Sequence, residues 1–193
     1  MLSLRKIAIT GNLASGKSTI GRILQEYGAY VVDADEIVHS LLSPHTPIGK
    51  KVIELLGPEI LVRNQIDRNK ISEIVFSDFK KLKSLEKILH PAVREEIHRR
   101  FDSVKNNSSY KFFVAEVPLL YEADMEKDFD RVIAVIADET IAHARFKGTQ
   151  GAKRQARQQS SGDKASKADF VITNNGDLSE LRSSVEAIID RLI

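Results

Sequence analysis

The stretch KIAITGNLASGKST, residues 6–19, decides the fold class of this chain. Apolar residues at 6–10 predict a short buried strand that ends at a glycine-rich turn, and residues 18–26 carry apolar positions at helical spacing. A second apolar run at residues 30–32 ends at Asp33. Strand, turn, helix and strand in this order predict a βαβ unit with parallel strands.

The glycine-rich turn matches the pattern GxxxxGK[ST] in full. Such a loop directs successive backbone N–H groups toward one point, beside the positive end of the following helix, and so suits phosphate. Lys17 can reach the β- and γ-phosphates, and the Ser18 hydroxyl can bind Mg²⁺. A chance glycine-rich turn is the alternative, but the motif stands between a strand and a helix, as its mechanism requires. The predicted residues that bind ATP are Gly11, Asn12, Leu13, Ala14, Ser15, Gly16, Lys17, Ser18 and Thr19.

The rest of the chain extends the same sheet. Apolar runs predict further strands at residues 111–117, 131–137 and 170–173, and residues 36–105 carry mainly helical patterns. Strands that alternate with helices indicate parallel pairing. The sequence therefore predicts an α/β fold, with a P-loop NTPase-type parallel sheet flanked by helices.

The helical stretch interrupts this fold without forming a separate domain. We expect one P-loop domain over residues 1–193, with a helical insertion at 36–105 and a short lid at 140–167. Within the predicted lid, residues 143–167 are basic, polar and glycine-containing, which is typical of a mobile surface segment.

Local signals predict where several helices begin and end. Gly57 and Pro58 should end one helix, because glycine caps helices and proline cannot continue them. Pro91 fits the first position of another helix, over residues 92–101. Asp177, followed three residues later by a glutamate, resembles a capping box at the start of the final helix.

Composition narrows the class of protein. Hydrophobic residues make up 42% and the net charge is +2, so nothing draws the chain generally toward nucleic acid or membranes. The absence of cysteine excludes disulfides, thiolate metal sites and a cysteine nucleophile. The N-terminus lacks a signal-peptide core, and no apolar run approaches the roughly 20 residues that span a bilayer. We expect a cytoplasmic protein.

Two acids follow predicted strands. Asp33 should lie at the same sheet edge as the P-loop, where it could accept a hydroxyl proton or orient an acceptor toward the γ-phosphate. It could instead cap the helix that follows, although Asp35 is better placed for that structural role. Glu116 ends the apolar run before Pro118 and could contact Mg²⁺ through water or contact the acceptor; a solvated loop carboxylate is the alternative.

Basic residues crowd the segment after the fourth predicted strand. Arginines of a lid can stabilise the charge of a γ-phosphoryl transition state. A solvated basic face is the alternative interpretation. The residues concerned are Arg145, Lys147, Lys153, Arg154 and Arg157.

Four ordered elements resemble the dephospho-CoA kinase family, over nearly the whole chain. After the P-loop, Asp33-Ala34-Asp35 with His39 is similar to the family's DADxIxH pattern, and Leu89-His90-Pro91 with Arg94 to its LHPxIR stretch. Residues 117–122, VPLLYE, resemble its PLLFE element, and residues 168–174, ADFVITN, its ADxVIxN strand. Gln158, four residues after Arg154, and Lys164 keep the spacing that leads into that strand.

The resemblance implies a P-loop kinase with a nucleotide core, a helical CoA-binding region and a lid, which phosphorylates the ribose 3′-hydroxyl of dephospho-CoA with ATP and Mg²⁺. Asp33 would be the catalytic base, and Lys17 and Arg154 would act on the phosphates. His90 and Arg94 would bind the acceptor, together with Asp33 and Glu116, and Ser18 would bind the metal.

The chain departs from the family in two places. Glu116 stands where aspartate is usual, and the lid is shorter and lacks the usual arginine-aspartate-glycine stretch. A nucleoside monophosphate or shikimate kinase is one alternative, and a nucleotide-binding module with weakened catalysis is another. A GTPase-like switch is disfavoured because NKxD and DxxG motifs are missing from suitable places. A monomer fits the sequence.

Overall fold

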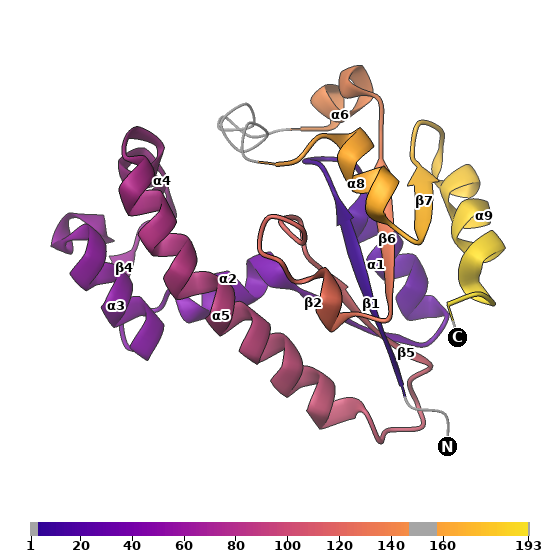
Figure 1. Ribbon diagram of the computed structural model, residues 1–193, viewed down its shortest axis with the longest axis horizontal. Helices are drawn as coiled ribbons and strands as arrows, with labels where there is room; N and C mark the ends of the chain where they lie inside the picture. Colours follow the sequence, from indigo (N-terminus) through magenta and orange to yellow (C-terminus); the bar gives the residue numbers. More distant parts are fainter. Residues whose placement is uncertain (1–3, 147–157, 193) are drawn as a thin grey trace. The chain divides into compact units, whose positions relative to one another are not determined.

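A five-stranded parallel sheet organises the computed structural model, which describes residues 4–146 and 158–192 (Figure 1). The strand order is β2-β5-β1-β6-β7, and all neighbouring strands run in the same direction. This confirms the predicted α/β fold class. The strands are β1 Arg5–Gly11, β2 Ala29–Asp33, β5 Phe112–Glu116, β6 Arg131–Ile136 and β7 Phe170–Thr173.

Helices cover both faces of the sheet, so its strands are apolar on both sides. Ile7, Ile9 and Val114 face a core that α1 Lys17–Glu26 and α9 Leu178–Ile189 complete. On the opposite face Phe113 stacks on Tyr30, with ring centroids 5.8 Å apart. The short helix α8 Ser161–Lys167 packs against β1 and β6, and α6 Glu139–Arg145 follows β6.

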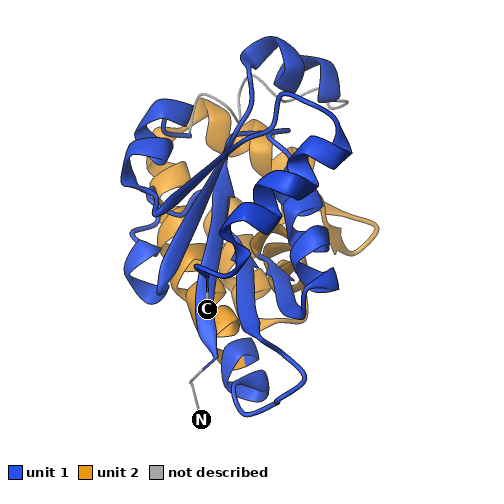
Figure 2. Cartoon of the chain, turned by 90° about the vertical axis from the view of Figure 1, so that its right-hand side faces the viewer, with its two compact units in different colours: residues 1–33, 100–193 blue, residues 34–99 orange. Residues whose placement is uncertain are grey.

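The chain divides into two compact units, coloured blue and orange in Figure 2. The first, Met1–Asp33 with Arg100–Ile193, contains the sheet, and the second is Ala34–Arg99. The second unit has its own apolar core, which includes Val52, Leu56 and Ile60. Its elements are α2 Ala34–Leu41, α3 Pro47–Leu56, the 3₁₀ helix η1 Pro58–Ile60, β3 Leu61–Val62, β4 Gln65–Ile66, α4 Arg68–Ser77 and most of α5 Phe79–Val104.

The second unit is mainly helical, as predicted, and α3 ends at Leu56 with Gly57 as its C-cap. A small antiparallel hairpin, β3-β4, was not predicted. Its turn places Arg63 and Asn64 at φ 49° and 60°, a conformation that hairpins usually obtain with glycine. The Arg-Asn pair carries no such signal, which explains the omission.

The expectation that Pro91 begins a helix is wrong, because Pro91 lies inside the continuous helix α5. A proline in a helix interior removes one hydrogen bond and costs about 3 kcal/mol. Apolar packing offsets this cost on both sides of the proline. Leu85 belongs to the core of the second unit, and beyond the proline Ile97 is 1% exposed.

Two further local expectations need correction. Helix α2 starts at Ala34, so Asp35 lies in its first turn, where a negative charge favours the helix dipole, and does not cap it. The segment 143–167 is not uniformly a surface excursion, because it contains the end of α6 and all of α8, and Lys164 is buried. The cap at Asp177 is confirmed, since its Oδ1 accepts hydrogen bonds from the N–H groups of Ser179 and Glu180.

Across the described ranges 4–146 and 158–192, no helix combines the length and apolar character needed to cross a membrane.

Candidate active site

The P-loop connects the end of β1 to the start of α1, as the sequence predicts. Gly16 caps α1 at φ 102°, and a Cβ there would lie 2.1 Å from Asn174 Nδ2, so only glycine fits. Asn174, which follows β7 directly, donates from Nδ2 to the Ser15 carbonyl at 2.8 Å. The loop is therefore fixed from a distant strand as well as by its own turns.

Lys17 folds back across the loop. Its ammonium Nζ donates to the carbonyl oxygens of Gly11 at 3.0 Å and Asn12 at 2.9 Å. These contacts join the two ends of the P-loop and keep a positive charge beside its backbone. That position suits a cation that meets the β- and γ-phosphates.

The two predicted acids lie opposite each other at the carboxyl edge of the sheet. Asp33 at the end of β2 is in register with Glu116 at the end of β5, and Glu116 is in register with Ile9 of β1. Strands in register present these side chains to the same face of the sheet. The placement of Asp33 and Glu116 at the P-loop edge therefore agrees with the βαβ prediction.

Glu116 is 6% exposed and contacts the P-loop helix directly. Its Oε2 accepts a hydrogen bond from Ser18 Oγ at 2.9 Å. Space for the other oxygen comes from Gly21 on α1, where an added Cβ would lie 2.4 Å from Oε1. Glu116 is thus a buried carboxylate held against the P-loop serine, which excludes the solvated-loop alternative.

The side-chain oxygen atoms at this edge suit Mg²⁺ as ligands. A serine hydroxyl and a carboxylate oxygen, 2.9 Å apart, are the hard oxygen ligands that this ion prefers. Over the residues described, no three His, Asp or Glu side chains gather into a complete metal cage. Mg²⁺ usually binds through one or two protein oxygens, with water and phosphate as its other ligands, so Ser18 and Glu116 fit it.

A pocket of about 230 Å³ adjoins the P-loop, lined among others by Gly16, Thr19 and Arg145. Arg145 donates from Nη1 to the Asn174 carbonyl at 2.8 Å and from Nη2 to the Gly176 carbonyl at 3.3 Å. The guanidinium therefore forms a fixed wall between α6 and the loop after β7. A planar cation beside a small pocket can stack on an aromatic base.

The remaining candidates are placed as follows. His90 and Arg94 lie one helical turn apart on α5, both half-buried, within the second unit. The predicted lid cations Lys147, Lys153, Arg154 and Arg157 lie outside the described residues, whereas Arg145 ends α6.

Several residues of this edge had no role assigned from the sequence. Besides Asn174, these are Gln158, whose Oε1 accepts a hydrogen bond from the Leu13 N–H at 3.1 Å, and the buried Lys164 with its ion-pair partner Glu122. Asn174 could have been suspected, because it is polar and directly follows a strand that ends near the P-loop. For Gln158 the sequence offered only its family-like spacing from Arg154. The burial of Lys164 has no signal in a segment that is basic and polar throughout.

Comparison with known proteins identifies the relatives of this chain. The family model described as "Dephospho-CoA kinase" matches residues 5–180. The dephospho-CoA kinase of Protochlamydia amoebophila is 49% identical over 199 residues, covering 100% of this chain and 98% of the relative.

Two solved structures are also similar. TT1252 from Thermus thermophilus superposes with a TM-score of 0.83 and 28% identity, covering 98% of both chains. Dephospho-CoA kinase from Campylobacter jejuni gives a TM-score of 0.71 and 26% identity, covering 97% of this chain and 96% of that one.

Proposed function

Because the chain belongs to the dephospho-CoA kinase family, we propose that it transfers the γ-phosphoryl group of ATP to the 3′-hydroxyl of dephospho-CoA. This reaction yields coenzyme A and ADP. The observation that carries the proposal in the structure is the register of Asp33 with Glu116 at the edge where the P-loop begins. This edge of the sheet combines the backbone donors of the P-loop, the carboxylates of Asp33 and Glu116, and the hydroxyl of Ser18 within one unit of the chain.

The P-loop binds the phosphates in this proposal. Backbone N–H groups of residues 14–18 and the start of α1 supply the donors, and Lys17 neutralises charge on the β- and γ-phosphates. Thr19 and Arg145 border the pocket that receives the base or ribose. Arg154, expected from the sequence to reach ATP, stays a prediction.

Asp33 accepts the proton of the acceptor hydroxyl. As that oxygen forms its bond to the γ-phosphorus, the bond between the γ-phosphorus and the β–γ bridging oxygen breaks and ADP leaves with the electron pair. Asp33 ends its strand at the P-loop edge, within the same unit as Lys17 and Ser18. A base in this position raises the rate by about 10²–10⁴-fold.

Ser18 and Glu116 would hold Mg²⁺ in this proposal, with the serine hydroxyl and the carboxylate as the oxygen groups that face it. When bound, Mg²⁺ would supply positive charge that offsets the negative charge developing on the phosphate oxygens. Glu116 also keeps the Ser18 hydroxyl in a fixed direction through their 2.9 Å hydrogen bond.

The second unit provides acceptor contacts in this proposal, with His90 and Arg94 as the binding residues. Arginine is suited to the phosphates of dephospho-CoA because its planar donors match phosphate oxygens. We also propose a cytoplasmic enzyme without a nucleic-acid partner, and a monomer stays the expectation for its assembly.

The test is incubation with Mg-ATP and dephospho-CoA, with the product followed by mass spectrometry. The expected result is one phosphate added to dephospho-CoA and an equal amount of ADP. Phosphorylation of AMP or shikimate in its place would overturn the assignment. The variant Asp33→Asn should bind ATP normally and lose about 10²–10⁴-fold in kcat. A near-normal kcat in this variant would remove Asp33 as the base.

A further inference from the structure

Lys164 is a fully buried lysine in the short polar helix α8, with 0% of its side chain exposed. Its Nζ donates to the Pro118 carbonyl at 2.6 Å and lies 3.2 Å from Glu122 Oε1. Burial lowers the pKa of Lys164, and the Glu122 carboxylate opposes that shift. Burying an ammonium group carries a desolvation cost unless the group is paired. Glu122 supplies that pairing for Lys164.

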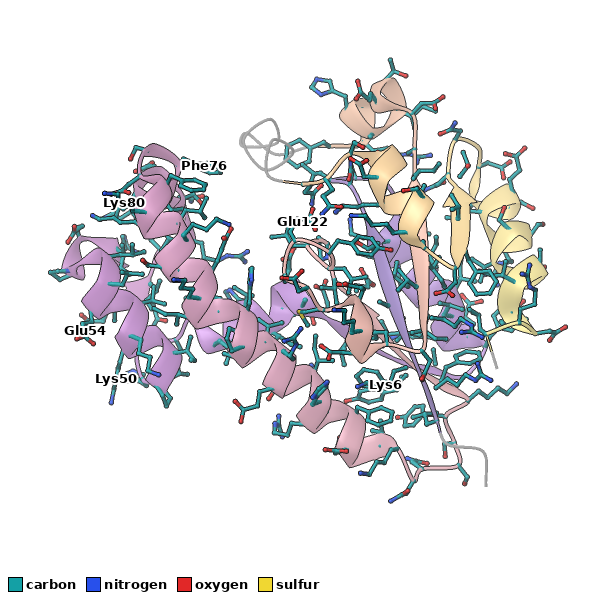
Figure 3. All side chains as sticks on the ribbon, viewed as in Figure 1. Lys6, Lys50, Glu54, Phe76, Lys80 and Glu122 are labelled. Carbon is teal, nitrogen blue, oxygen red and sulfur yellow. The ribbon has the colours of Figure 1, made fainter. Side chains whose placement is uncertain are left out.

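Glu122 joins the same segment a second time. Its Oε1 also accepts a hydrogen bond from the Gln159 N–H at 2.7 Å, and its side chain is 16% exposed. Glu122 comes from the loop that follows β5, where Figure 3 labels it. One carboxylate therefore binds the backbone at residue 159 and the ammonium at residue 164, which fixes the segment 158–164 to the β5 exit loop.

The fixed segment also contacts the P-loop. Gln158 Oε1 accepts a hydrogen bond from the Leu13 N–H at 3.1 Å. Ser161 Oγ accepts one from Asn12 Nδ2 at 2.9 Å. Both contacts lie on the first half of the loop, while Lys17 and Ser18 occupy its end. The segment 158–164 thus connects the β5 exit loop to the phosphate-binding backbone.

The contact with Leu13 fixes the direction of the Gln158 amide. A backbone N–H can only donate, so the amide oxygen must face Leu13. The NH₂ group of the same amide then stands beside the loop with two donors of its own. Hydrogen-bond donors beside the P-loop backbone suit the oxygens of a terminal phosphate.

We propose that Gln158 donates a hydrogen bond to the γ-phosphate and that Lys164 is a positioning residue that holds Gln158 there through its ion pair with Glu122. This inference rests on the proposed function, because it adds a residue to the phosphate site of the same reaction. The alternative is that the ion pair of Lys164 and Glu122 supports α8 alone and that Gln158 has no part in the reaction.

The variant Gln158→Glu separates these possibilities. It keeps an oxygen acceptor for the Leu13 N–H but replaces the NH₂ donor with a negative oxygen. We expect kcat to fall about 10- to 100-fold, because a hydrogen bond to a charged group is lost. By calorimetry, a non-hydrolysable ATP analogue should bind about tenfold more weakly or worse, whereas ADP, which lacks the γ-phosphate, should stay within about threefold.

Lys164 is tested by Lys164→Met and Lys164→Arg. The control is Lys127→Met, because Lys127 is an exposed lysine of the 3₁₀ helix η2 Glu126–Asp128, outside the segment 158–164. Lys164→Met should also weaken the binding of the ATP analogue while leaving the binding of ADP nearly unchanged. Lys164→Arg should restore part of the lost affinity, because arginine keeps the charge beside Glu122. Lys127→Met should behave as the wild type.

The outcomes distinguish the inference from the proposed function. If the wild type phosphorylates dephospho-CoA while Gln158→Glu keeps its kcat, the inference is wrong and the function stands. If the wild type does not phosphorylate dephospho-CoA, the binding measurements still decide the inference. If Gln158→Glu weakens the binding of ADP and of the ATP analogue equally, the inference is wrong. This result decides the inference even if Lys164→Met fails to fold.

Discussion

The substitution Gly21→Ala tests how the carboxylate of Glu116 is held. The added Cβ would lie 2.4 Å from Glu116 Oε1 and 3.3 Å from its Cδ. The carboxylate must then move by about 1 Å to reach an ordinary contact distance. Its hydrogen bond with Ser18, 2.9 Å long, cannot survive such a shift unchanged.

The magnitude follows from two opposing effects. Loss of a hydrogen bond to a charged group costs about 1.5–3 kcal/mol. Alanine in place of glycine inside α1 recovers about 1 kcal/mol through helix propensity. We expect a net loss of about 0.5–2 kcal/mol in the free energy of unfolding. In kinetics, kcat/KM for Mg-ATP should fall about tenfold or more, because the Ser18 hydroxyl loses its fixed direction.

The assay compares Gly21→Ala with a matched glycine variant and with a rescue. Gly162→Ala is the control, because a Cβ there meets nothing closer than Ser160 Oγ at 3.8 Å. Adding Glu116→Asp to Gly21→Ala shortens the carboxylate by one methylene and should recover part of the lost kcat/KM. Unchanged kinetics in Gly21→Ala, or a double variant no better than the single one, would refute the reasoning.

Three further substitutions give separate tests. Asn174→Ala leaves the Ser15 carbonyl without its amide donor and should lower the free energy of unfolding by about 1–3 kcal/mol, measured by thermal unfolding. An unchanged Tm would contradict the role of Asn174 in anchoring the P-loop. Pro91→Ala restores a hydrogen bond inside α5 and should stabilise the protein by about 1–3 kcal/mol, so a lower Tm would show that α5 needs the proline. Because burial lowers the pKa of Lys164 in the folded protein, the unfolded chain binds more protons between that lowered pKa and the ordinary value. The stability of the wild type relative to Lys164→Met should therefore rise with pH across this window, and a relative stability that falls would contradict it.

The fold was predictable because its signals are local. The apolar runs that form β1, β5 and β6 are flanked by turn residues, and the P-loop fixes the order of strand and helix around it. The structure differs where tertiary packing decides. Pro91 is tolerated inside α5 because apolar residues on both sides are buried, and no local pattern reveals that they share one helix.

The candidate site was predictable in part. Parallel topology brings Asp33 and Glu116 to the P-loop edge, and both follow recognisable strands. The contact between Asn174 and Ser15 joins positions 159 residues apart, and the one between Lys164 and Pro118 spans 46. Such partners depend on how the strands are ordered in the sheet, which a single sequence leaves open.

The basic segment 143–167 shows that basic residues grouped in a sequence do not have to place their charges in the active site. Two of its described cations serve the framework: Arg145 donates to two backbone carbonyls after β7, and the buried Lys164 pairs with Glu122. Among the described residues, Lys17 is the cation that lies across the P-loop itself. A buried cation that pairs with an acid cannot also neutralise a phosphate, but it can fix the neutral groups that do bind one. The amide of Gln158 is such a group, so the segment contributes to the phosphate site through its geometry.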